Sequence, residues 1–182
     1  MIKELKNPLT DNYKNLKKEI FSEGIPWYYY EKTVSEFEAQ DIPFFSHMLL
    51  RRPLEEIDGM PAPLISIPTS KYFEKCYFIL KEILDFNNIN FNVVYRMNLN
   101  LTLNNSIKES MPHTDLNLPH KVLIIYLNKF KNGKTIVLDE NNKKFYSKPK
   151  EDGVIIFDGK LLHYHQTPEL HEKRLVMVAN FQ

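Results

Sequence analysis

The stretch Arg96-Met97-Asn98-Leu99-Asn100-Leu101-Thr102-Leu103 decides the expected fold, because polar and apolar side chains alternate along its whole length. Successive side chains of a β-strand point to opposite faces of a sheet, so this period of two predicts a strand with one buried face. Shorter strands are expected after it, at Lys121–Leu127, Thr135–Leu138, Lys144–Tyr146, Val154–Phe157 and Leu175–Phe181.

The segments between these strands have the composition of tight turns. They contain the dipeptides Asn132-Gly133, Asn141-Asn142, Asp152-Gly153 and Asp158-Gly159. Such residues tolerate the backbone conformations that hairpin turns require. Because no helical pattern separates the strands, the sequence predicts antiparallel pairing in a sandwich or barrel rather than a parallel sheet with crossover helices.

The sequence before this β region predicts two helices. The first ends near Gly24 and has Asp11 as its candidate cap. Its apolar residues recur at helical spacing: Tyr13, Leu16 and Ile20. The second is Lys71–Phe86, where apolar side chains recur every three or four residues behind Ser70, a candidate N-cap. Residues 25–70 hold six of the eleven prolines, which predicts short strands and long loops there.

Composition and charge limit the class of protein. With 182 residues, 43% hydrophobic and 26% charged, the chain is predicted to form one globular domain over 1–182, mainly β with helices, with its β core at about 91–182. A formal net charge of +1 gives no electrostatic support to bulk nucleic-acid binding. The single cysteine, Cys76, excludes a disulfide framework and fits a reducing cytoplasm. No apolar run is long enough to cross a membrane, so no membrane contact is expected.

Three residues of the β region have the pattern of a metal site. In Met111-Pro112-His113-Thr114-Asp115, His113 and Asp115 are two apart, so on an extended segment their side chains point to the same side. His163 follows some fifty residues later, six residues after a strand that ends at Phe157. Two histidines and one carboxylate occupy one face of an octahedral ion and leave three positions open, as in non-haem Fe(II) oxygenases. The alternative is an ordinary loop, with His113 exposed and Asp115 capping a turn.

The order of H-x-D, a distant histidine and then Arg174 resembles the double-stranded β-helix 2-oxoglutarate/Fe(II)-dependent dioxygenases, over roughly residues 91–182. This resemblance implies a jelly-roll core with N-terminal and buttressing helices, and Fe(II) held by His113, Asp115 and His163. It also implies 2-oxoglutarate as co-substrate and O2 as oxidant. Arg174 matches the basic residue that meets the far carboxylate of 2-oxoglutarate in this family.

Tyr126 carries a second part of the resemblance. The stretch Lys121–Asn128 is similar to the strand after H-x-D in prolyl-hydroxylase-like members, where a tyrosine before Leu-Asn reaches the same carboxylate. Tyr126 is the matching residue, and its alternative role is that of a core aromatic with a solvated hydroxyl group. Ile25–Tyr30 and Phe44–His47 resemble segments of small phage-encoded members, which would place the protein in the host cytoplasm.

The distal histidine and several polar residues leave alternatives open. His163 is preferred as the ligand because it stands six residues after the strand-ending Phe157, as in the family. The nine residues from His165 to Arg174 resemble the interval common among prolyl hydroxylases and favour His165 instead. Two further histidines, His120 and His171, are expected in loops. Arg96 and Asn98 are expected to face either a barrel lumen or water. Asn180 is expected on the same face of its strand as Arg174, because the two residues are an even number of positions apart.

The resemblance implies hydroxylation of a C–H bond while 2-oxoglutarate and O2 are converted to succinate and CO2. The substrate is unidentified: a protein or peptide, with a prolyl residue as one candidate, or a small molecule. Two other classes stay open. One is a cupin-type metal enzyme that uses a different co-substrate, and the other is a non-catalytic jelly-roll binding module, which has no need for a metal.

Overall fold

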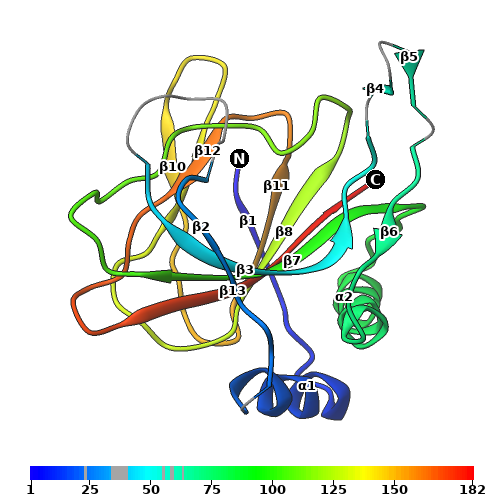
Figure 1. The fold of residues 1–182 in the computed structure, drawn as a ribbon, viewed down its shortest axis with the longest axis horizontal. Helices are drawn as coiled ribbons and strands as arrows, with labels where there is room; N and C mark the ends of the chain where they lie inside the picture. Colours follow the sequence, from blue (N-terminus) through cyan, green and yellow to red (C-terminus); the bar gives the residue numbers. More distant parts are fainter. Residues whose placement is uncertain (23, 34–40, 55, 58–59, 63) are drawn as a thin grey trace.

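Three antiparallel sheets, one of them only a pair of short strands, and two helices are found in the part of the chain that the computed structural model describes, residues 1–22, 24–33, 41–54, 56–57, 60–62 and 64–182 (Figure 1). The large sheet has the order β1 (Lys3–Leu5), β11 (Val154–Asp158), β8 (Lys121–Tyr126), β13 (Lys173–Phe181), β7 (Val94–Leu103), β3 (Phe44–Arg51) and β2 (Tyr28–Tyr30), and β6 (Ile67–Pro68) pairs with β3. The small sheet has the order β10 (Lys144–Tyr146), β9 (Thr135–Leu138) and β12 (His163–His165). A separate hairpin joins β4 (Glu56–Ile57) to β5 (Met60–Pro61).

The expected fold class is confirmed: the architecture is a jelly roll with helices packed on one sheet. All five strands predicted after the alternating stretch are present, and every described strand pair is antiparallel. The large sheet also includes β1, β2 and β3, which precede the β region expected at about 91–182. In the turn between β10 and β11, Asp152 has a φ of 62°, the left-handed conformation that its Asp-Gly sequence favours.

The helices differ from expectation in their first residues. Helix α1 (Asp11–Phe21) is capped by Thr10 rather than Asp11, because the Thr10 hydroxyl accepts a hydrogen bond from the Tyr13 amide at 3.2 Å. Helix α2 (Phe73–Phe86) begins two residues later than predicted, and the Ser70 hydroxyl accepts from the Tyr72 amide at 3.1 Å. Neither described helix is both long and apolar enough to cross a membrane.

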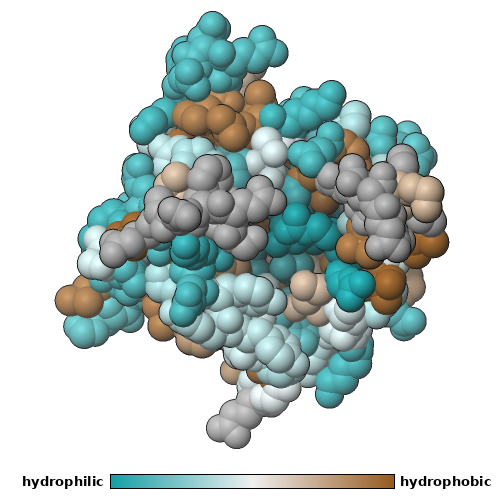
Figure 2. Space-filling model, turned by 45° about the horizontal axis from the view of Figure 1, so that its top comes forward, coloured by the Kyte–Doolittle hydropathy of each residue, from teal (hydrophilic) through white to brown (hydrophobic). Residues whose placement is uncertain are grey.

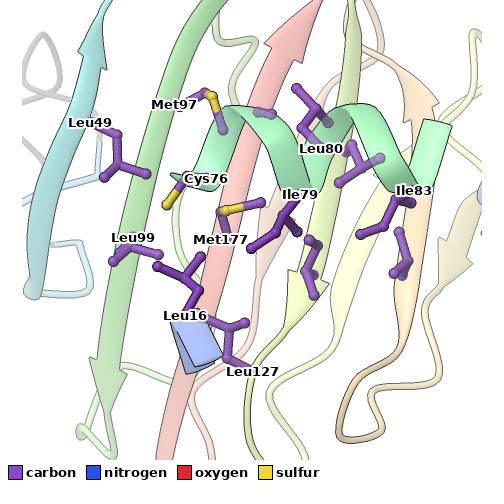
Figure 3. Close-up of a cluster of buried hydrophobic side chains, with 14 of the residues drawn as sticks. Leu16, Leu49, Cys76, Ile79, Leu80, Ile83, Met97, Leu99, Leu127 and Met177 are labelled. Carbon is purple, nitrogen blue, oxygen red and sulfur yellow. The ribbon is translucent and has the colours of Figure 1, made fainter. Parts of the chain in front are cut away.

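The alternation along β7 separates the two faces of the large sheet. Met97 and Leu99 are completely buried against α1 and α2, and Figure 3 shows Ile79, Leu80 and Ile83 of α2 pointing toward this face. The polar residues of β7 face the small sheet instead, where a second apolar cluster includes Val122 of β8 and Val137 of β9. The polar face of the predicted strand is therefore turned toward the interior of the jelly roll.

Two of the remaining histidines lie in loops, with different surroundings. His171 is exposed and has a positive φ of 64°. His120 is buried just before β8, where its Nδ1 donates to the Leu118 carbonyl at 2.8 Å and its backbone carbonyl accepts from the Gly159 amide at 2.9 Å. A Cβ atom at Gly159 would lie only 2.1 Å from His120 Nε2. The loop position of His120 therefore depends on glycine at residue 159.

We predict that Gly159→Ala lowers the free energy of unfolding by about 1–3 kcal/mol, the usual cost of overpacking a buried site. Urea denaturation measures this loss. In a His120→Ala background the same substitution should cost less than about 0.5 kcal/mol, because its clashing partner is gone. Equal losses in the two backgrounds would show that the ring of His120 is not what excludes the methyl group.

Candidate metal centre

His113 and His163 lie opposite each other across a β-bridge that joins the loop before β8 to β12. The His113 amide donates to the His163 carbonyl at 3.0 Å, and the His163 amide donates to the His113 carbonyl at 2.9 Å. Directly opposed residues of such a bridge place their side chains together, and the two ring centroids are 4.8 Å apart. Asp115 completes the group, in which the potential ligand atoms all lie within 4.8 Å of one another.

The two imidazole rings are oriented by backbone carbonyl groups. Nδ1 of His113 lies 2.9 Å from the Met111 carbonyl oxygen, and Nδ1 of His163 lies 3.0 Å from that of Leu161. A carbonyl oxygen can only accept, so each Nδ1 carries a proton, and in the neutral form of each ring Nε2 then has the lone pair. The Nε2 atoms lie 4.0 Å and 3.5 Å from the Asp115 carboxylate oxygens. These are the donor atoms that a non-haem iron site requires.

The charge states of the group also suit a metal ligand set. Burial raises the pKa of Asp115, but Arg96, followed by His163 and His113, outweighs it and holds this pKa well below its ordinary value. Burial lowers the pKa of His113, and the nearby His163 lowers it further. Asp115 is therefore ionised and His113 neutral near neutral pH, which is the protonation that coordination needs.

The Asp115 carboxylate is held from two adjacent strands. Nη1 of Arg96 on β7 lies 2.7 Å from Oδ1, and Nδ2 of Asn180 on β13 lies 2.8 Å from Oδ2. Arg96 and Asn180 are direct partners in the strand register. Arg52 donates in addition to the backbone carbonyl of Asp115 at 3.1 Å. Side-chain parity placed Asn180 on the face of Arg174, but no sequence pattern indicated that Arg96, Asn180 or Arg52 would meet Asp115.

We predict that Asn180→Leu lowers the affinity for Fe(II) by about 10- to 100-fold, the usual effect of removing a hydrogen-bonding partner of a metal ligand. Anaerobic equilibrium dialysis with iron analysis measures it. Asn100→Leu is the matched control. Asn100 lies on β7, on the same face of the large sheet as Asn180, but its side chain accepts a hydrogen bond from Ser46 and forms none with Asp115. Equal affinities of the two variants would remove Asn180 from the support of the site.

The metal-ligand candidates and Arg174 line one cavity of about 610 Å³. The face drawn in Figure 2 is hollowed near its middle, and the residues seen in the hollow are hydrophilic. Arg174 is only 4% exposed, and it donates to the Gly133 carbonyl at 3.0 Å and to the Thr135 hydroxyl at 3.1 Å. Burial lowers its pKa, an effect that Tyr126 opposes, and a guanidinium group nevertheless stays charged.

Arg174 makes no ion pair with any carboxylate of the described residues. A buried charge is expensive unless a partner compensates it. A surface arginine paired with Glu169 or Glu172 would be the alternative role for Arg174, and it does not fit a buried side chain that lines the cavity. An anion that enters this cavity can supply the missing partner.

Tyr126 neighbours Arg174 but, unlike Arg174, is not among the described residues that line the cavity. Its hydroxyl group donates to the Ser147 hydroxyl at 2.8 Å and lies 2.9 Å from that of Thr135. The Arg174 guanidinium is 5.7 Å from the Tyr126 ring centroid. The predicted direct contact of Tyr126 with a bound carboxylate stays a prediction.

His165 occupies a different place from His163, although both belong to β12. Its Nδ1 lies 3.2 Å from the Ser110 hydroxyl and its Nε2 lies 3.3 Å from that of Thr102. Burial, with the charge of Arg174, holds its pKa well below the ordinary value, so the ring is neutral. The structure thus brings His163, and not His165, to Asp115, while His165 lines the same cavity.

A jelly roll with H-x-D and a distant histidine around one internal cavity defines a class of fold, that of the 2OG-Fe(II) oxygenases. No family model and no curated protein matches the sequence. Among solved structures, an oxidoreductase of the 2OG-Fe(II) oxygenase family from Burkholderia pseudomallei is similar, with 14% identity, a TM-score of 0.71, and coverage of 100% of this chain and 84% of that one.

Two prolyl hydroxylases share this fold. The enzyme from Trichoplax adhaerens, in complex with a hypoxia inducible factor peptide fragment, has 9% identity and a TM-score of 0.62 over 99% of this chain and 82% of that one. The viral collagen prolyl hydroxylase from Paramecium Bursaria Chlorella virus-1, in its 2OG complex, has 13% identity and a TM-score of 0.55 over 99% and 94%. The suspected resemblance to this superfamily is confirmed at the level of the fold.

Proposed function

We propose that the protein is a 2-oxoglutarate- and Fe(II)-dependent dioxygenase that hydroxylates a C–H bond of its substrate. One observation carries the proposal: His113, Asp115, His163 and the buried Arg174 line the same cavity. The first three have the donor atoms of an iron site, and the fourth is a buried cation without an ion pair among the described residues. Together they match one iron and one dicarboxylate.

Different residues bind the metal and the co-substrate. Nε2 of His113, Nε2 of His163 and the Asp115 carboxylate would hold iron, and three protein ligands would leave coordination positions for the co-substrate. Arg174 binds the far carboxylate of 2-oxoglutarate, because its planar fork donates two parallel charge-assisted hydrogen bonds. The Thr135 hydroxyl accepts one hydrogen bond from Arg174 and lies 2.9 Å from the Tyr126 hydroxyl, so these two residues orient the guanidinium group.

Iron, 2-oxoglutarate and O2 together supply the oxidising chemistry, which inserts one oxygen atom into a substrate C–H bond and yields succinate and CO2. The protein binds and orients these groups and excludes water from them. A peptide substrate with a prolyl residue is supported by the fold shared with prolyl hydroxylases, one of which is described with a bound peptide. A small-molecule substrate is the second candidate.

The two rival classes predict different sites. A non-catalytic jelly-roll module does not need imidazole nitrogens, a carboxylate and a buried guanidinium in one cavity. A cupin-type enzyme with another co-substrate does not need Arg174 in the same cavity as the metal ligands. Succinate formation separates the proposed function from both rivals: Fe(II)-loaded protein incubated with 2-oxoglutarate in air should form succinate above the metal-free background. No succinate from protein that has bound iron would contradict the proposed reaction.

A further inference from the structure

Asp41 is a buried carboxylate outside the metal-ligand group. The residue as a whole is only 5% exposed. Its Oδ1 accepts hydrogen bonds from the amides of Ile42 at 2.7 Å and Met111 at 3.0 Å. Its Oδ2 accepts from the Thr33 amide at 2.7 Å and from the Thr33 hydroxyl. Burial raises its pKa, but these hydrogen bonds outweigh burial and place the pKa below its ordinary value.

Met111 connects this carboxylate to the candidate iron site. Its amide donates to Asp41, and its carbonyl accepts the Nδ1 proton of His113 at 2.9 Å. Pro112, between Met111 and His113, restrains the backbone here. Its own φ is fixed, and it restricts Met111 to extended conformations. The adjacent Ser110 amide is held by the His165 carbonyl at 2.9 Å. The direction of the Met111 carbonyl therefore depends on few contacts, and Asp41 makes one of them.

The Met111 carbonyl decides which nitrogen of His113 is free for a metal. A neutral imidazole carries one proton, and the hydrogen bond of one nitrogen sets the state of the other. With the proton on Nδ1, Nε2 faces Asp115 with a lone pair. If the Met111 backbone turns away, the ring loses this restraint and the form protonated on Nε2, which cannot ligate, becomes populated.

We propose that Asp41 is a positioning residue of the metal centre: through the Met111 backbone it fixes the tautomer and the ring orientation of His113. The inference rests on the proposed function only in taking His113 as a ligand. Asp41 touches none of the three ligand candidates in the described hydrogen-bond network. Its effect is therefore transmitted through two successive hydrogen bonds rather than by contact with the metal.

The competing explanation is a structural one, in which Asp41 merely ties Thr33 to Ile42. Experiments can separate these two roles, because Met111 and Ile42 donate to one carboxylate oxygen of Asp41 and Thr33 donates to the other. Asp41→Ala removes every hydrogen bond, whereas Asp41→Asn keeps an oxygen acceptor for Met111 and Ile42 and weakens the Thr33 side. Thr33→Val removes only the Thr33 hydroxyl contact. Positioning requires Asp41→Ala to affect His113 and the other two variants to leave it unchanged, even where all three lower stability.

The first measurement uses metal-free protein, so it does not depend on activity. Long-range ¹H–¹⁵N NMR distinguishes the two imidazole tautomers, and the His113 signals are assigned by their loss in His113→Gln. Wild type, Asp41→Asn and Thr33→Val should show His113 protonated on Nδ1. Asp41→Ala should show a mixture or the opposite tautomer. Asp41→Ser, whose hydroxyl is too short to reach Met111, replaces it if the alanine variant fails to fold.

The second measurement is the Fe(II) affinity of the same variants. Asp41→Ala should bind Fe(II) about 10- to 100-fold more weakly, the range found for residues that support metal ligands, and the other two should stay within threefold. A wild-type tautomer with unchanged affinity in Asp41→Ala overturns the proposal, and so does an equal loss in Thr33→Val. Unchanged Fe(II) binding by His113→Ala would instead reject the proposed function, while the tautomer of metal-free protein would still test Asp41.

Discussion

His113→Ala, Asp115→Ala and His163→Ala are each expected to lower the affinity for Fe(II) at least about 100-fold. Removing a partner of a ligand costs about 10- to 100-fold, so removal of the ligand itself should cost more. Each variant leaves only two of the three converging groups. Anaerobic equilibrium dialysis with iron analysis measures the affinity, and circular dichroism shows whether the fold is intact.

His165→Ala is the matched control for the distal ligand. His165 shares β12 and the cavity with His163, but its ring nitrogens meet the hydroxyl groups of Ser110 and Thr102. Its removal should leave Fe(II) affinity within about threefold. If His165→Ala loses iron and His163→Ala keeps it, the distal ligand is His165 and the site is built differently from the geometry described above.

Arg174→Ala should raise the dissociation constant of 2-oxoglutarate by roughly 30- to 5,000-fold with iron saturating, equivalent to about 2–5 kcal/mol for an uncompensated carboxylate. Arg174→Lys should recover part of this loss, since an ammonium group keeps the charge but not the fork. Isothermal titration under anaerobic conditions measures both constants.

Lys173→Ala is the control for the loss of a positive charge at this strand. Lys173 precedes Arg174, is exposed, and lies over the ring of Phe21 on the helix side of the sheet. It should bind 2-oxoglutarate as the wild type does. A change below threefold in Arg174→Ala, with an intact fold and intact iron binding, would remove Arg174 from the site and with it the main support for this co-substrate.

The fold was predictable where polar and apolar residues alternate over a long stretch of sequence. The alternation along Arg96–Leu103 predicted a strand and its buried face, whereas the polar face was left open between a barrel lumen and water and is turned toward the interior in the structure. The short strand β12 was not predicted, since His163-Tyr164-His165 contains no run of apolar residues. The eight-residue β3 was also missed as a strand of the large sheet, because it lies within a proline-rich stretch.

The candidate site was predictable only for residues whose local spacing carries chemistry. The H-x-D spacing placed His113 and Asp115 on one side, and parity placed Asn180 on the face of Arg174. The contacts of Asp115 with Arg96, and of Met111 with Asp41, link residues 19 and 70 positions apart. Contacts at such separations depend on how strands and loops pack, and no local pattern encodes them.

The central claim is that iron and 2-oxoglutarate bind together in the cavity that His113, Asp115, His163 and Arg174 line. The most direct test is an anaerobic titration of the metal-free protein, first with Fe(II) and then with 2-oxoglutarate, followed by visible absorption. The account predicts a new charge-transfer band that appears only when both are present and is absent in Asp115→Ala. A wild-type protein that binds Fe(II) but gives no such band with saturating 2-oxoglutarate would contradict it.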